Sequence, residues 1–192
     1  MNDDPATQTP KQDSTTPLPF TPGDSASRLN IQIQKILVPV DFSSCSGRAL
    51  SYAIGFAQQF KASIALIHVV ELNYMGTGLG EIEVPLLENE LRENASRQLD
   101  SLLETAVRAG VTAEAHLRLG RPWYEMTEAA RTLGADLVIM GTHGYTGLKH
   151  VLMGSTAERV VRHAPCPVLI VREREREFLQ PPTEPVQPPP AA

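Results

Sequence analysis

The residues with the clearest chemical potential form a glycine-rich stretch, residues 141–155, with the sequence GTHGYTGLKHVLMGS. Two residues separate Gly141 from Gly144, and nine separate Gly144 from Gly154. Because glycine has no Cβ, such a segment can bring backbone N–H groups close to an anion. The spacing indicates an anion-binding loop, although glycines that only serve tight turns would give a similar pattern.

The end of this stretch has the composition of a helix start. Gly154, Ser155 and Thr156 open a run with helical character, and the first N–H groups of a helix attract anions. The loop and the helix start together predict a phosphate-binding cradle. The chain contains no G-x-x-x-x-G-K-[ST] motif and no G-x-G-x-x-G after its first strand, which disfavours a P-loop motor and an ordinary dinucleotide dehydrogenase.

A second polar group stands at the end of the first apolar run. Residues 35–40 (KILVPV) read as a buried strand, and Asp41 follows directly. In open parallel sheets, ligands bind beyond the carboxyl ends of the strands, where the strand order reverses. If strands 35–40 and 137–140 are neighbours, Asp41 faces Gly141 and can accept hydrogen bonds from ribose hydroxyls. An N-cap role for Asp41 in the following helix is equally compatible with its position, and the two roles can coexist.

The elements that must position these residues alternate regularly between strand and helix. Helical patterns are predicted after Ser43 and Ser44, after Pro122, and over residues 154–164. A longer helix that stops at Gly110 is predicted to bury one apolar stripe, formed by Leu91, Ala95, Leu99, Leu102, Leu103 and Ala106. The predicted strands are residues 35–40, 63–70, 111–119, 137–140 and 168–171, and residues 73–80 read as a loop. This alternation predicts an α/β fold with a doubly wound parallel sheet.

Two of the strands have the character of sheet edges. Residues 111–119 alternate apolar and polar side chains, which predicts one solvated face. The last strand, Val168–Val171, is apolar throughout, and a long apolar edge left open invites aggregation. Pairing with the same strand of a second subunit would cover it and give a homodimer. A tail folded over the strand is the alternative.

Composition limits the class of protein. At 192 residues with a net charge of −5, the chain is long enough for one domain and is not basic enough to attract nucleic acid. A secretory signal and an apolar run of membrane-spanning length are both missing from this sequence, which predicts a cytoplasmic location without membrane attachment. Cys45 and Cys166 are expected to be reduced, and the histidines show no metal-ligand spacing. Most of the 16 prolines lie in the two ends, so residues 1–32 and 174–192 read as disordered tails around a domain at 33–173.

Taken together, several short motifs make the sequence similar to the universal stress protein family. They are Val38-Pro39-Val40-Asp41-Phe42-Ser43, Leu66-Ile67-His68-Val69, and the spacing of Gly141, Gly144 and Gly154-Ser155. The likeness covers about residues 33–172, and the intact glycine motif resembles the ATP-binding branch of the family. It implies a Rossmann-like, five-stranded parallel sheet of order 3-2-1-4-5 that binds adenine nucleotide, and a homodimer through the last strand.

The resemblance also implies roles for individual residues. Pro39 and Asp41 would lie at the adenosine, with Asp41 accepting from the ribose, and Val69 would meet the adenine with its backbone amide and carbonyl. Met140 and Gly141 would line the nucleoside pocket. The phosphates, bridged by Mg²⁺, would be held by the remaining residues of the motif, namely Gly144, Gly154, Ser155 and Thr156.

Three functions are compatible with these residues. The first is an ATP-binding regulatory module whose nucleotide state alters its dimer or partner surface. The second is an enzyme, either a slow ATPase or a protein that phosphorylates itself on Ser155, Thr142 or Thr146. Against catalysis, the loop offers no arginine finger and no evident base to position water. The third is a dimeric scaffold that binds no nucleotide.

Overall fold

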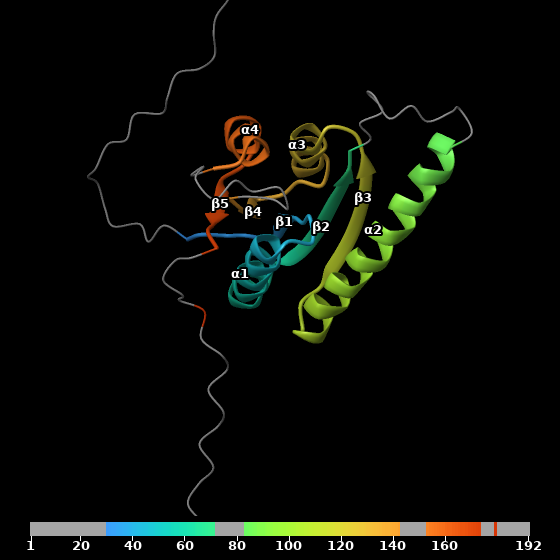
Figure 1. The fold of residues 1–192 in the computed structure, drawn as a ribbon. Helices are drawn as coiled ribbons and strands as arrows, with labels where there is room; N and C mark the ends of the chain where they lie inside the picture. Colours follow the sequence, from blue (N-terminus) through green and yellow to red (C-terminus); the bar gives the residue numbers. More distant parts are fainter. Residues whose placement is uncertain (1–29, 72–82, 143–152, 174–178, 180–192) are drawn as a thin grey trace, which may run out of the picture. The chain divides into compact units, whose positions relative to one another are not determined.

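A computed structural model of the chain describes residues 30–71, 83–142, 153–173 and 179, with only the backbone described for residues 83–87. The five strands form one sheet of order β3-β2-β1-β4-β5, and every adjacent pair is parallel (Figure 1). The elements in chain order are β1 (Lys35–Pro39), α1 (Ser44–Phe60), β2 (Ser63–Val70), α2 (Glu83–Arg108), β3 (Ala113–Leu119), α3 (Pro122–Thr132), β4 (Leu137–Gly141), α4 (Ser155–His163) and β5 (Val168–Val171).

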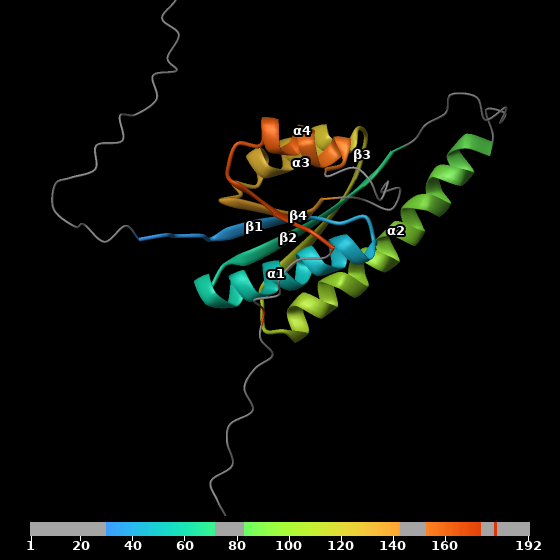
Figure 2. The same ribbon diagram turned by 60° about the vertical axis from the view of Figure 1, so that its left-hand side comes forward.

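The helices cover the sheet on both faces. Helices α1 and α2 lie on one face and α3 and α4 on the other, so the domain has three layers (Figure 2). Alternate residues of each central strand feed the two cores: Ile36 and Val38 pack toward α1, whereas Leu37 packs toward α3 and α4. The unbroken apolar runs of β1, β2 and β4 are explained by burial on both faces. The predicted doubly wound sheet and its strand order are confirmed.

Local sequence signals set most of the helix ends. Ser43 is the N-cap of α1, and its side chain accepts a hydrogen bond from the Ser46 backbone N–H. Pro122 occupies the first turn of α3, where its missing N–H costs nothing. Gly110, with φ of 79°, follows the end of α2 in a conformation that favours glycine. These boundaries agree with the predicted starts and stops.

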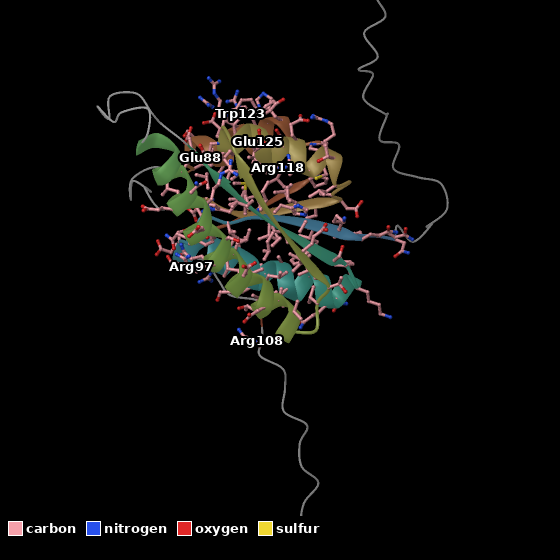
Figure 3. All side chains as sticks on the ribbon, turned by 90° about the vertical axis from the view of Figure 1, so that its right-hand side faces the viewer. Glu88, Arg97, Arg108, Arg118, Trp123 and Glu125 are labelled. Carbon is pink, nitrogen blue, oxygen red and sulfur yellow. The ribbon has the colours of Figure 1, made fainter. Side chains whose placement is uncertain are left out.

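Two expectations about side-chain exposure need correction. Leu91, predicted on the buried stripe of α2, is 41% exposed, whereas Ala95, Leu99 and Ala106 farther along the helix are buried. The strand over residues 111–119 begins at Ala113 and lies at the predicted sheet edge, but its polar face is not simply solvated. Arg118 reaches α3 and pairs with Glu125 at 3.5 Å, as Figure 3 shows between β3 and α3. Periodicity alone therefore misplaced Leu91, which is exposed on α2, and Arg118, which contacts α3.

The loop predicted at 73–80 lies outside the described residues, as do the predicted tails 1–32 and 174–192 except for residues 30–32 and 179. Within the described part of the chain, no helix combines the length and apolarity that a bilayer crossing requires.

Candidate functional site

The central feature is that the pairing of β1 with β4 stops before the carboxyl ends of the two strands, which are Pro39 and Gly141. The β1–β4 ladder covers only Ile36–Leu137 and Leu37–Val138, whereas the β1–β2 ladder continues to Pro39–Ile67. Lys35 O accepts from Asp136 N on the β4 side, so the backbone groups of Leu37 and Pro39 also face β4. Because Pro39 has no N–H, it cannot continue that ladder. Proline in a central strand therefore coincides with the point where a crevice can open.

Backbone groups of the flanking strands face the same place. Val40 N donates to Ile67 O at 2.9 Å, so the backbone of Ile67 faces β1. Val69 follows Ile67 by two residues, so its N–H and C=O point in the same direction, past the end of β1. On β4, Val138 N donates to Pro167 O of β5, and the backbone of Gly141 therefore faces β1. Val69, Pro39 and Gly141 lie at the carboxyl ends of three adjacent strands, β2, β1 and β4.

Asp41 lies directly beyond β1, at the entrance to α1. Its Oδ1 accepts hydrogen bonds from the Ser43 hydroxyl at 2.6 Å and from the Ser43 backbone N–H at 3.2 Å. The N-cap interaction is made by Ser43, so the alternative N-cap role for Asp41 is wrong in detail: Asp41 orients the residue that caps. A carboxylate has two oxygens with room for several donors, so Asp41 can hold Ser43 and still accept from a ligand hydroxyl.

The turn that places Asp41 is held by an aromatic contact. Phe42 has φ of 66°, an uncommon conformation for a bulky residue, and its ring lies 4.4 Å from the His68 ring, centroid to centroid. His68 Nδ1 is 2.8 Å from Val40 O. His68 is therefore a packed, hydrogen-bonded residue, and its two contacts tie the β1–α1 turn to β2.

Gly141 is required by close packing against α1. A Cβ at this position would lie 2.6 Å from Cys45 Sγ and 3.3 Å from the Cys45 carbonyl carbon. Backbone cannot retreat as a flexible side-chain end can, so a larger residue at position 141 would push α1 and β4 apart. Glycine at this position is needed for contact within the protein, and its backbone still faces the crevice.

A buried residue links the end of β4 to the start of α4. Thr142 is 4% exposed; its N–H donates to Val171 O at 3.0 Å, and its carbonyl accepts from Gly154 N at 2.8 Å. The Cys45 thiol lies 3.9 Å from the Thr142 hydroxyl and 3.6 Å from Val171 O. The start of α4 is therefore fixed beside the end of β4, whatever path residues 143–152 take between them.

The start of α4 offers donors to a ligand. Gly154 is the N-cap and makes no side-chain cap hydrogen bond, and Ser155 and Thr156 are the first helical residues. The first N–H groups of a helix have no partner within it. Ser155 is exposed and Thr156 half-buried, so their backbone and hydroxyl groups are within reach of a bound anion.

The structure thus brings together most of the predicted site. Val69, Pro39, Asp41, Met140 and Gly141 end neighbouring strands, and Gly154, Ser155 and Thr156 are attached to that edge through Thr142. Gly144 lies outside the described residues, and so do His143, Thr146 and Lys149. In the described segments, no group of three or more His, Cys, Asp or Glu side chains is arranged to hold a metal ion.

Sequence reasoning missed the two residues that join the parts of this site, Cys45 and Thr142. Both are small and neither lies at a position that periodicity marks as core, so only the position of Thr142 after an apolar run gave any signal. The other cysteine is placed differently. Burial, and the nearby Asp136 carboxylate, raise the pKa of the Cys166 thiol, which makes it a poorer nucleophile at neutral pH.

Known proteins are similar to this chain in sequence and in architecture. The model of the universal stress protein family matches residues 32–172. The chain is 36% identical over 144 residues to the universal stress protein MJ0531 of Methanocaldococcus jannaschii, an alignment that covers 75% of this chain and 85% of that protein.

Solved structures agree. The structure of MJ0577, from the same archaeon, aligns with a TM-score of 0.69 at 29% identity and covers 76% of this chain and all of that one. A universal stress protein solved in complex with cAMP, at 24% identity and a TM-score of 0.56, shares the fold over 73% of this chain and 98% of its own. The match of the family model to residues 32–172, the 36% identity to a member of the family and the shared sheet architecture lead to one conclusion: this chain belongs to the universal stress protein family.

Proposed function

We propose that the crevice between the carboxyl ends of β1 and β4 binds an adenine nucleotide, ATP, and that the protein acts as a nucleotide-dependent regulatory module. The observation that supports the proposal is the combination of two features at the carboxyl ends of these strands. The β1–β4 ladder stops after Leu37–Val138, and the start of α4 is held there through the 2.8 Å bond from Gly154 N to Thr142 O.

The nucleoside would occupy the opening between the strands. Asp41 would accept hydrogen bonds from the ribose hydroxyls with the carboxylate that also holds Ser43. Val69 would present its N–H and C=O to the adenine edge, a donor and acceptor pair that suits adenine without any polar side chain. Pro39, Met140 and Gly141 would line the pocket.

The phosphates would lie at the start of α4. Gly154, Ser155 and Thr156 would donate to them from the first turn, together with Gly144 from the glycine-rich segment. This chain shows no dedicated metal cage in its described residues, so Mg²⁺ would be held mainly by the phosphates, as is usual for this ion in nucleotide sites. Bound Mg²⁺ would supply charge neutralisation of the triphosphate.

The regulatory part of the proposal rests on the position of β5. Strand β5 is at the sheet edge, and its end is bonded to Thr142, the residue that also holds α4. We expect two copies to pair through Val168–Val171. Nucleotide and dimer edge would then share a structural link, which fits a binding module whose surface changes with its ligand.

A direct experiment distinguishes this function from its alternatives. Protein purified without added nucleotide is denatured, and the supernatant is analysed by chromatography and mass spectrometry. Refolded or stripped protein is then titrated calorimetrically with ATP, ADP, AMP and cAMP in the presence of Mg²⁺. ATP in the supernatant and binding of ATP support the proposal. Release of ADP alone from ATP-loaded protein favours the enzyme, and no binding of any nucleotide favours the scaffold.

Asp41→Ala tests the assigned site. Loss of a hydrogen-bonded carboxylate should weaken ATP binding by roughly 10- to 100-fold, the equivalent of about 1.5–3 kcal/mol. Asp100→Ala is the matched control, because Asp100 is an exposed aspartate on α2, away from the crevice. Equal affinities for the two variants, with both folded by circular dichroism, would rule out the ribose assignment.

A further inference from the structure

One residue beyond the matched family domain packs into the core. Leu179 lies outside residues 32–172 and is half-buried against the cluster that α1, α2 and the sheet form. Arg174, Glu175, Arg176 and Glu177 precede it in the sequence, and a proline-rich stretch follows. Leu179 thus packs on the domain although its sequence neighbourhood is charged and proline-rich. This contact needs a structural explanation.

The explanation lies in a glycine in the middle of α1. A Cβ at Gly55 would lie 2.9 Å from Leu179 Cδ2, so the end of the Leu179 side chain would have to shift to make room for it. Glycine in a helix interior costs about 1 kcal/mol relative to alanine, so its presence calls for a packing reason. The other glycine of α1, Gly47, has open space where its Cβ would be. Leu179 thus fills a notch that Gly55 leaves on the outer surface of α1.

The chain is also held where it leaves the sheet. Val171 O accepts from Thr142 N at 3.0 Å, and Glu173 O accepts from Arg48 Nη1 at 3.3 Å. Arg48 and Gly55 lie two turns apart on the same helix. The segment after β5 is therefore attached to α1 at two described points, one polar at Glu173 and one apolar at Leu179.

We infer that the notch at Gly55 is a docking surface on α1 and that the C-terminal extension of the same chain is its occupant, with Leu179 as the anchor. The surface takes one branched apolar side chain, that of Leu179. Docking in cis covers apolar surface of α1 and fixes the chain that leaves β5. This inference does not depend on nucleotide binding, so its failure and the failure of the proposed function are separate results.

The test is a double-mutant cycle in the full-length chain. Gly55→Ala and, as the matched control, Gly47→Ala are made with Leu179 present and in a Leu179→Ala background, and urea unfolding is measured for all. At Gly47, alanine should favour folding by roughly fourfold in the unfolding equilibrium in both backgrounds, from helix propensity alone. At Gly55 the gain should be smaller than at Gly47 while Leu179 is present, because Leu179 must shift to make room for the new methyl group, and it should reach the Gly47 value once Leu179 is alanine.

Equal gains at the two glycines in both backgrounds would overturn the inference. A second readout does not depend on stability: trypsin cleavage after Arg174 or Arg176, followed by mass spectrometry. Leu179→Ala and Gly55→Leu should each accelerate this cleavage by roughly threefold or more, because local opening controls access. Gly47→Ala should leave the rate unchanged. An unchanged rate in Leu179→Ala would show that Leu179 does not anchor the extension.

Discussion

At the scale of single residues, two residues determine how the carboxyl ends of β1 and β4 are arranged. Pro39 removes the N–H that would continue the β1–β4 ladder, and Gly141 allows α1 to approach β4 without a Cβ between them. The first ends the pairing of β1 with β4, and the second lets α1, which begins three residues after Asp41, lie close to the end of β4. Both effects come from atoms that these residues lack.

Gly141→Ala should destabilise the fold. The new Cβ would lie 2.6 Å from Cys45 Sγ, and overpacking of this kind typically costs about 1–3 kcal/mol. The free energy of unfolding, measured by urea titration, checks the cost. Cys45→Ala in the same chain removes the sulfur and should recover part of it, so the double variant should be more stable than the sum of the single effects by about 1 kcal/mol.

Additive effects of the two substitutions would show that position 141 and Cys45 do not press on one another. Gly47→Ala is the control for inserting a methyl group where space is open, and it should not destabilise the protein.

How much of this site the sequence could predict depends on the kind of signal. Asp41 and Gly154–Thr156 follow or precede regular elements, so their positions at the sheet edge could be anticipated from strand and helix patterns. The contacts of Cys45 and Thr142 could not, because they join segments about a hundred residues apart and involve no periodic position. Which residue caps α1 also needed coordinates, since Asp41 and Ser43 are both good capping residues and the structure has Ser43 as the N-cap.

At the scale of elements, prediction worked where burial is simple. The strands β1, β2, β4 and β5 are unbroken apolar runs, and their bounds agree with expectation to within one residue. The errors lie on α2 and β3: Leu91 of α2 is exposed, and the polar face of β3 contacts α3 through Arg118. Leu91 belongs to the helical stripe, but exposure depends on how far the neighbouring elements extend, which periodicity does not encode.

The amino-terminal edge of the sheet carries a charge pair that predicts a pH effect. Lys35 Nζ lies 3.2 Å from Glu114 Oε1, and His116 Nε2 lies 3.5 Å from the same oxygen. Partial desolvation would raise the pKa of Glu114, but the hydrogen bonds and charges of Lys35 and His116 outweigh it and lower that pKa from 4.5. A lowered folded-state pKa stabilises the protein above the unfolded value and ceases to do so as pH falls through the folded value.

Lys35→Met should therefore reduce stability at pH 7, and the difference from wild type should shrink on acidification below about pH 4.5 and vanish near pH 3. Since the Lys35 and Glu114 side chains are 30% and 47% exposed, we expect the effect to be small, about 0.5 kcal/mol or less. Urea midpoints of both proteins across this range provide the measurement. Arg97→Met on exposed α2 is the control, and a difference that grew on acidification would contradict the assigned sign.

At the scale of the whole molecule, the two edge strands, β3 and β5, are buried to a similar degree. Edge strand β3 contacts α2 and, through Arg118, α3, and β5 packs on β4 and α1; apart from the exposed Glu114 and the buried Val171, the side chains of both strands are half-buried. Along β5, the carbonyls of Pro167 and Val171 accept from β4, so the backbone groups of Val168 and Ile170 point outward. These outward groups are the ones a second copy of β5 could bond.

Ile170→Pro should convert a dimer to a monomer without unfolding the domain. It removes an N–H that points away from β4, so the β4–β5 ladder keeps its bonds, and proline is tolerated on edge strands in this orientation. Ile170→Val is the matched control, because it keeps the N–H and a branched side chain and should remain dimeric. Sedimentation velocity over a range of protein concentrations measures the mass, and circular dichroism checks the fold. Pairing through β5 would be wrong if Ile170→Pro sedimented as a dimer or if the wild type were monomeric at every concentration. The half-buried strand would then need another cover, and a tail of the same chain is the remaining candidate.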